Sequence, residues 1–377
     1  MPAAISRRAE SLNSSVYRVG KAPDGVVPVP LNVGDTFLPP PEATLDHDEP
    51  HRYTPPAGLP SLREALAARI ATRNGLEVDL SQVMVTPGGT AALSALVGAM
   101  ADPGDAIMIC APHWPLIAGI ARVAMAEPLQ VPIFDGELSA ERVSSQLERF
   151  HRAGTRALYV NPIHNPSGRI LPLQAAEAMV EFARRHDLWI FADDVYEDFV
   201  FDDSDWPRLM RMAPERTIHI GSASKAFGIA GARVGWAAGP AEIVKAGLKI
   251  HLNTGYCAPR WGQRMTEQLL EVGGAGERWQ AKARAAYAEA GRSAAQRLGV
   301  EAPLGGQFMF VSVAEHLDRD QDSPLTDFLQ RCLNEGVSLA PGTSCGPFPE
   351  HVRVCFTCAH PDEVARGVES MARVMGR

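Results

Sequence analysis

Short apolar runs alternate with amphipathic stretches through the middle of this 377-residue chain. Apolar runs bounded by turn residues are typical of the buried strands of a parallel sheet. Helical stretches, among them 90–101 and 172–185, lie between several of these runs, and this alternation predicts a mainly parallel α/β sheet. The strands are predicted at 82–86, 106–110, 157–160, 188–193, 217–221 and 234–238.

The pattern differs toward both ends of the chain. Repeated prolines between positions 28 and 41 exclude long regular elements from the N-terminal part. Ser61-Leu-Arg-Glu64 has the spacing of a capping box, so we expect a helix to begin there and to run to Gly75. From Glu277 a long helix leads into a smaller unit, with strands at 308–313 and 352–357 and a final helix from Pro361.

These patterns predict two domains, in keeping with the chain length. Residues 1–44 are expected to form an N-terminal arm and part of a small α+β domain. Residues 45–285 would form the large domain, and residues 286–377 the C-terminal part of the small one.

Composition narrows the class of protein. A hydrophobic content of 46% and a charged content of 21% fit a soluble globular protein, and the net charge of −8 argues against a broad nucleic-acid surface. The N-terminus lacks the apolar core of a signal peptide, and Pro87 interrupts the longest uncharged run, 85–101. We therefore expect a cytoplasmic protein without a membrane partner.

Two spacings could indicate metal or redox chemistry. Cys355 and Cys358 form a CxxC pair, but on the predicted strand they would point to opposite faces, and no second pair completes a zinc site. His47 and His51 stand four apart with Pro50 between them, which disfavours a helix. We predict a structural role for the cysteines, a surface loop for the histidines, and no metal site.

Candidate functional residues follow the predicted strands, whose carboxyl ends bind ligands in open α/β sheets. Gly88, Gly89 and Thr90 open a helix, where free N–H groups favour an anion. Asp193 ends a buried strand and needs a partner for its charge. The chain contains neither GxGxxG nor GxxxxGK[ST], so the sequence does not support a dinucleotide or P-loop site.

The segment 221–236 is the most informative part of the chain. Lys225 follows the hydroxyl pair Ser222 and Ser224 and precedes Arg233 by eight residues. A lysine that forms a Schiff base with an aldehyde cofactor requires such neighbours, because hydroxyls and a guanidinium hold the cofactor's phosphate.

This segment resembles the cofactor-lysine motif of the class I/II aminotransferases, which are pyridoxal 5′-phosphate (PLP) enzymes of the aspartate-aminotransferase fold, fold type I. Asn161-Pro-Ile-His-Asn165-Pro-Ser-Gly168 is similar to the family's N-P-x-x-N-P-[TS]-G loop, with serine where threonine is commoner. Asp193-Asp-Val-Tyr196 is similar to its D-[DE]-x-Y pattern. The matches keep the family's order from residue 34 to 353, and they imply a mainly parallel, seven-stranded-type sheet covered by helices.

The resemblance also implies a role for each matching residue. Lys225 would carry the Schiff base and move the proton, Trp114 would stack on the pyridine ring, and Asp193 would pair with its nitrogen. Tyr53 would reach the phosphate in the neighbouring subunit, which implies a homodimer with shared active sites. The full cofactor set is Gly88, Gly89, Thr90, Trp114, Asn165, Asp193, Tyr196, Ser222, Ser224, Arg233 and Tyr53, and the substrate set is Gly34, Asn165 and Arg353, whose guanidinium would clamp the α-carboxylate.

The implied activity is transfer of an amino group between an L-amino acid and a 2-oxo acid by a ping-pong mechanism. A different PLP reaction, such as elimination, cyclisation or oxidation, remains open, because the fold does not determine the reaction. A non-catalytic PLP-sensing domain is a minor alternative, since the chain before Gly34 is too short for a DNA-binding module.

Substrate identity is suggested only by departures from relatives. Thr90 stands where some acid-specific relatives have lysine, and Cys345 stands where phenylalanine is common, which would widen the pocket. The stretch 251–256, expected near the partner's site, offers no arginine, and the position of Arg260 stays open. We predict that aspartate is not the preferred amino donor.

Overall fold

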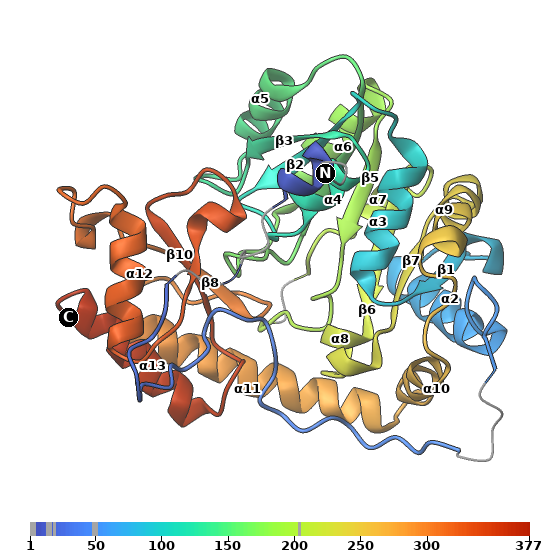
Figure 1. Ribbon diagram of the computed structural model, residues 1–377. Helices are drawn as coiled ribbons and strands as arrows, with labels where there is room; N and C mark the ends of the chain where they lie inside the picture. Colours follow the sequence, from blue (N-terminus) through green and yellow to red (C-terminus); the bar gives the residue numbers. More distant parts are fainter. Residues whose placement is uncertain (1–4, 13–16, 18–19, 47–51, 203–204) are drawn as a thin grey trace.

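A seven-stranded sheet forms the centre of the molecule (Figure 1). The computed structural model describes residues 5–12, 17, 20–46, 52–202 and 205–377. The order of the strands is β1-β7-β6-β5-β4-β2-β3, and only β7 runs antiparallel to its neighbours. This confirms the predicted mainly parallel sheet. Its strands are β1 (Val83–Thr86), β2 (Ala106–Ala111), β3 (Glu127–Pro132), β4 (Thr155–Val160), β5 (Trp189–Asp193), β6 (Thr217–Ser222) and β7 (Gly235–Ala238).

Helices cover both faces of this sheet (Figure 1). Side chains alternate along a strand, so Ile107 and Ile109 of β2 pack toward one set of helices while Met108 and Cys110 pack toward the other. The first set is α3 (Gly89–Met100), α4 (Ile117–Val123) and α9 (Ala241–Thr254), and the second is α5 (Ala140–Phe150), α6 (Leu173–Arg185) and α7 (Leu209–Met212). Beyond β1 lie α2 (Pro60–Asn74) and α10 (Arg260–Leu269).

A smaller unit contains an antiparallel sheet in the order β8-β10-β9. The long helix α11 runs from the large unit to this smaller one, and part of the N-terminal arm follows it along the lower edge in Figure 1. The predicted domain boundary at 285/286 falls inside α11 and stays a prediction. The elements here are α11 (Ala275–Leu298), β8 (Phe308–Ser312), α12 (Pro324–Asn334), β9 (Ala340–Pro341), β10 (His351–Cys355) and α13 (Pro361–Val374), and the remaining short helices are α1 (Arg7–Glu10) and α8 (Ala223–Ala226).

Two local expectations are corrected. The capping box at Ser61 is wrong, because α2 already begins at Pro60 and no side chain caps it. Proline at the first helical position replaces the cap, since its missing N–H would be unpaired there in any case. The edge strand β3 had no apolar run to reveal it, because Pro128 and Pro132 interrupt it, and proline is tolerated in a strand at a sheet edge.

The prediction that both cysteines of the CxxC pair lie on one strand is wrong. Strand β10 ends at Cys355, so Cys358 lies in the following bend and its thiol donates to the Cys355 carbonyl at 3.6 Å. Among the described residues, no three His, Cys, Asp or Glu side chains are grouped as a metal site, and no helix is long and apolar enough to cross a bilayer. His47 and His51 lie outside the described residues.

Candidate active site

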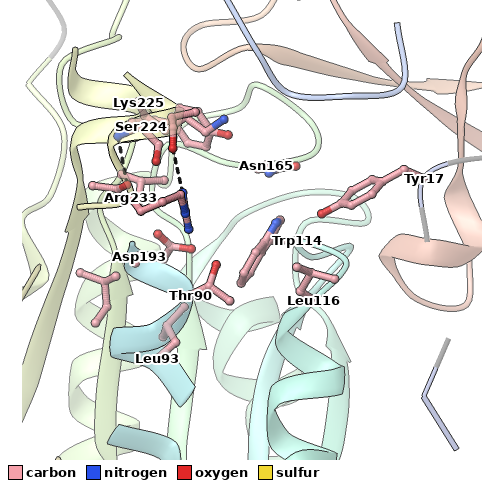
Figure 2. A pocket seen from close by; sticks show the side chains of 16 residues that line it. Tyr17, Thr90, Leu93, Trp114, Leu116, Asn165, Asp193, Ser224, Lys225 and Arg233 are labelled. Atoms are coloured by element: carbon pink, nitrogen blue, oxygen red, sulfur yellow. Dashed lines mark hydrogen bonds between the residues drawn. The ribbon is translucent and has the colours of Figure 1, made fainter. Parts of the chain in front are cut away.

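One cavity of about 280 Å³ collects most of the predicted site residues (Figure 2). It lies where β2, β4, β5 and β6 end and α3 begins, at the carboxyl edge of the sheet. Gly34, Gly88 and Arg353 contact residues that line it without lining it themselves. The predicted residues on its wall are Gly89, Thr90, Trp114, Asn165, Asp193, Tyr196, Ser222, Ser224, Lys225 and Arg233, and further lining residues include Tyr17, Leu93, Leu116, Val195, Ile220 and Ala230.

Lys225 lies in the short helix α8, directly after β6. Ser222 caps this helix, since its hydroxyl accepts the Ser224 N–H at 3.2 Å. The Lys225 Nζ donates to the Gly34 carbonyl at 2.7 Å, and burial lowers its pKa. A lowered pKa makes the neutral, nucleophilic amine easier to reach at neutral pH.

The antiparallel direction of β7 brings Arg233 to the cavity. The amino end of β7, rather than its carboxyl end, lies at this edge, and Arg233 stands two residues before it with φ +52°. Its Nη1 donates to the Ala230 carbonyl at 3.0 Å and its Nη2 to the Pro87 carbonyl at 3.2 Å. Gly88 has φ +89°, and an added Cβ there would collide with the guanidinium. The guanidinium thus lies beside the N-terminus of α3, a combination that favours an anion.

Asp193 presents an unpaired oxygen at this cavity. Its Oδ2 accepts the Tyr159 hydroxyl, and the Asn161 amide donates to its carbonyl. Its Oδ1 is buried and has no hydrogen-bond partner among the described residues. Burial raises the pKa of Asp193 to about 6. A cationic N–H donor placed in the cavity would satisfy this oxygen.

Sequence reasoning missed Tyr159 and Asn161, which hold Asp193 in place. A usable signal existed for Tyr159, because a tyrosine on a buried strand needs a partner for its hydroxyl. Asn161 also accepts the Asn165 N–H at 2.6 Å, so it connects the loop after β4 with the end of β5.

Arg353 is 1% exposed. Its guanidinium lies over the Phe308 ring at 4.2 Å and the Tyr17 ring at 5.4 Å. Nη1 donates to Asn165 Oδ1 at 3.2 Å and Nη2 to the Asn32 carbonyl at 2.9 Å, while Nε has no partner among the residues described. Asn165 therefore links Arg353 to the cavity.

The N-terminal arm supplies further contacts that the sequence did not reveal. Tyr17 lines the cavity, and no periodic pattern surrounds it in the irregular arm. An added Cβ on Gly34 would collide with Phe308, so a glycine lets the arm pass closely here. Cys345 is buried and does not line the cavity, so the structure does not support the expectation that it widens the pocket.

Tyr53 and Arg260 lie away from this cavity. Both line a separate surface depression, and the Tyr53 ring meets the Tyr256 ring edge-on at 5.0 Å. Tyr53 is 82% exposed. The chain by itself does not bring Tyr53 to the site of Lys225.

Solved structures share this fold. The aspartate aminotransferase from Thermus thermophilus with maleate superposes with a TM-score of 0.85 at 27% identity, over 99% of this chain and 100% of that one. The aromatic aminotransferase from Pyrococcus horikoshii superposes with a TM-score of 0.77 at 25% identity, over 86% and 88% of the two chains. The molecule therefore has the aminotransferase fold, with a lysine-centred cavity at the sheet edge.

The sequence identifies the family. The model of the family "Aminotransferase class I and II" matches residues 12–370, and the chain belongs to this family. It is 32% identical to the aspartate/prephenate aminotransferase of Thermus thermophilus, over 86% of this chain and 84% of that protein. It is also 32% identical to an arginine–pyruvate transaminase of Pseudomonas aeruginosa, over 58% of this chain and 56% of that protein.

Proposed function

We propose that this aminotransferase binds PLP at Lys225 and exchanges an amino group between an L-amino acid and a 2-oxo acid. The carrying observation is that Lys225 after β6 and the unpaired Oδ1 of Asp193 at the end of the adjacent strand β5 meet in one cavity. An amine for the cofactor's aldehyde and a carboxylate for its ring nitrogen are the two groups that PLP requires.

The remaining wall residues fit the rest of the cofactor. Trp114 would cover one face of the ring, and Asn165 and Tyr196 would reach its phenolic oxygen. The phosphate would lie between the Arg233 guanidinium and the free N–H groups of α3, where an anion is stabilised. The phosphate set is completed by Gly88, Gly89, Thr90, Ser222 and Ser224.

When bound, PLP supplies an electron sink that allows the Cα hydrogen of an amino acid to leave as a proton. Lys225 would accept this proton as a neutral amine and return it elsewhere, a role that its lowered pKa favours. Asp193 would keep the ring nitrogen protonated. Arg353, with Asn165 beside it, would hold the α-carboxylate and so orient the Cα hydrogen toward Lys225.

The first test separates transamination from another PLP reaction. An enzyme saturated with PLP and given one L-amino acid without an acceptor is expected to release about one equivalent of 2-oxo acid per site, because the amino group stays on the enzyme. Oxo acid and ammonia are measured together over time. Continuous release of ammonia or pyruvate would show an elimination reaction instead.

We also propose that the preferred amino donor has an uncharged side chain. The cationic side chains on the described cavity wall are Lys225 and Arg233, and Arg353 lies behind Asn165. Each of them has a role toward the cofactor or the α-carboxylate, and the wall near Trp114 is formed by Tyr17 and Leu116 (Figure 2). A second carboxylate on the substrate would then be buried without a partner from this chain.

The expected result is a kcat/KM for aspartate roughly 100-fold below that of the best neutral or aromatic donor. A panel of amino donors with a common acceptor measures this ratio. Aspartate is the essential comparison, because the relative from Thermus thermophilus is named for aspartate and prephenate. A higher value for aspartate than for neutral and basic donors would refute the proposal and point to a cation from a second copy.

A homodimer with shared active sites completes the proposal. It is supported by a surface of exposed aromatic side chains, with Tyr53 82%, Tyr256 47% and Trp261 38% exposed. Large exposed aromatic groups that lie together mark an interaction surface. In such a dimer Tyr53 would reach the neighbouring copy's phosphate site.

A further inference from the structure

His164 connects two loops that carry cofactor-facing side chains. It belongs to the loop after β4, directly before Asn165. Its Nε2 lies 2.8 Å from the Pro112 carbonyl, in the loop after β2 that continues to Trp114. Its Nδ1 lies 2.6 Å from the Ser167 hydroxyl, and its ring stacks on Phe134 at 3.5 Å with an angle of 8° between the planes.

These contacts determine the tautomer of the imidazole. A carbonyl oxygen can only accept, so Nε2 must carry the hydrogen that is donated to Pro112. Nδ1 then accepts the Ser167 hydroxyl. His164 is 2% exposed, and burial lowers its pKa to about 3, so the ring stays neutral at neutral pH. A neutral ring that makes two hydrogen bonds and stacks on Phe134 acts as a rigid connector rather than as an acid or a base.

We propose that His164 is a positioning residue that fixes the distance between Trp114 and Asn165, and so the width of the slot for the cofactor ring. The inference rests on the proposed binding of PLP in this cavity. Asn161, in the same loop, connects Asn165 to Asp193, because its side chain accepts the Asn165 N–H and donates to the Asp193 carbonyl. The Trp114 loop, the Asn165 loop and Asp193 are thereby held in one hydrogen-bonded series.

A set of three substitutions separates this role from simple packing. His164→Gln can place an amide nitrogen near the position of Nε2 and keep the hydrogen bond to the Pro112 carbonyl. His164→Asn can reach Ser167 but not Pro112, and His164→Phe keeps the stacking on Phe134 while losing both hydrogen bonds. We expect His164→Gln to bind PLP within about threefold of the unaltered protein, and the Asn and Phe variants to bind about tenfold more weakly.

Two measurements and one control variant accompany the dissociation constant for PLP. The circular dichroism band of the bound cofactor reports the tilt of its ring and should change in the Asn and Phe variants only. Thermal unfolding of the cofactor-free variants monitors folding. His351→Phe serves as the control, because His351 also stacks on a phenylalanine, Phe310, at 4.8 Å, outside the cavity. PLP affinity and the cofactor band should be unchanged in this control.

The outcomes are distinct. Normal PLP binding and an unchanged band in His164→Phe, or a glutamine variant as impaired as the phenylalanine variant, would refute the positioning role. Failure of the unaltered protein to bind PLP would instead refute the proposed function. Nitrogen-15 NMR of the cofactor-free protein gives an independent check, since a hydrogen on Nδ1 rather than Nε2 would contradict the assigned connection.

Discussion

Lys225→Ala is expected to lower amino-transfer turnover by about 10⁴-fold while leaving the protein folded. The substitution removes both the amine that would attach the cofactor and the group that would move the Cα proton. The fold should tolerate the change, because burial already disfavours the charged amine and its partner is the single carbonyl of Gly34. Steady-state kinetics and far-ultraviolet circular dichroism measure the two effects.

The chain contains only five lysines, at 21, 225, 245, 249 and 282, so the attachment site can be located directly. Borohydride reduction followed by peptide mapping should place the cofactor on Lys225 alone. Lys282→Ala is the matched control, because Lys282 is exposed on α11, and it should retain full activity. Retention of the absorption band of lysine-bound PLP in Lys225→Ala, with no other lysine labelled, would remove the basis of the assignment.

Asp193→Asn is expected to stabilise the cofactor-free protein at pH 8 and to lower turnover by about 10³-fold. The pKa of Asp193 is about 6 in the folded chain and near 3.9 in an unfolded one. Between these values the folded state holds a proton that the unfolded state has released. The contribution of this group to stability therefore falls as the pH rises from about 4 to 6, and the full cost of the buried charge is present above pH 6.

Burying the ionised Asp193 carboxylate costs about 3 kcal/mol of folding stability. Asp193→Asn removes this cost, but the new amide is left without a partner, which costs about 1 kcal/mol. The free energy of unfolding at pH 8 should thus rise by about 2 kcal/mol. The difference between the two proteins should vanish at about pH 4.5 and reverse below it, because the cost of the buried charge there falls below the cost of about 1 kcal/mol for the unpaired amide. Urea unfolding across this pH range measures it. PLP binding should weaken in the same variant, since a neutral amide lacks the negative charge that stabilises a protonated ring nitrogen.

Asp194→Asn is the matched control, because the neighbouring carboxylate is equally buried and also has one oxygen without a partner among the described residues. Its other oxygen pairs with His219 Nδ1 at 2.8 Å, whereas that of Asp193 accepts a neutral tyrosine hydroxyl. Burial raises the pKa of Asp194 as well, but Asp194→Asn also removes the charge partner of His219, so the gain in stability at pH 8 should be smaller than for Asp193→Asn. Equal changes in the free energy of unfolding of the two variants would contradict the view that the Asp193 carboxylate lacks a partner until a cationic ligand binds.

The sequence predicted six of the seven strands of the main sheet, because these are short, mainly apolar runs buried on both faces. It failed at β3, an edge strand interrupted by prolines, and at the start of α2, where a proline replaces a side-chain cap. Both are positions where a local signal is weak and the neighbouring structure determines the outcome. Cys358 shows the same limit, since the sequence does not mark the point at which β10 ends.

In the candidate site, too, the order of the sequence predicts the position of some residues, and only the tertiary structure places the others. Lys225, Asp193 and Asn165 lie at the carboxyl ends of strands or within a few residues of them. Parallel strands end at one edge of the sheet, so sequence order alone predicts that these residues lie together. Arg233 precedes a strand, and only the antiparallel direction of β7 places it beside the α3 N-terminus. Tyr17, Tyr159 and Arg353 depend on contacts between distant segments.

The sequence by itself determined the fold class, the family and the choice of Lys225 as the candidate lysine, because these follow from local periodicity and from short motifs with fixed spacing. The tertiary structure decided which groups face one another. It left one carboxylate oxygen of Asp193 unpaired, buried Arg353 behind Asn165, and set His164 between two loops. Packing and hydrogen bonding between segments far apart in the chain decide such pairings, and no local pattern of residues encodes them.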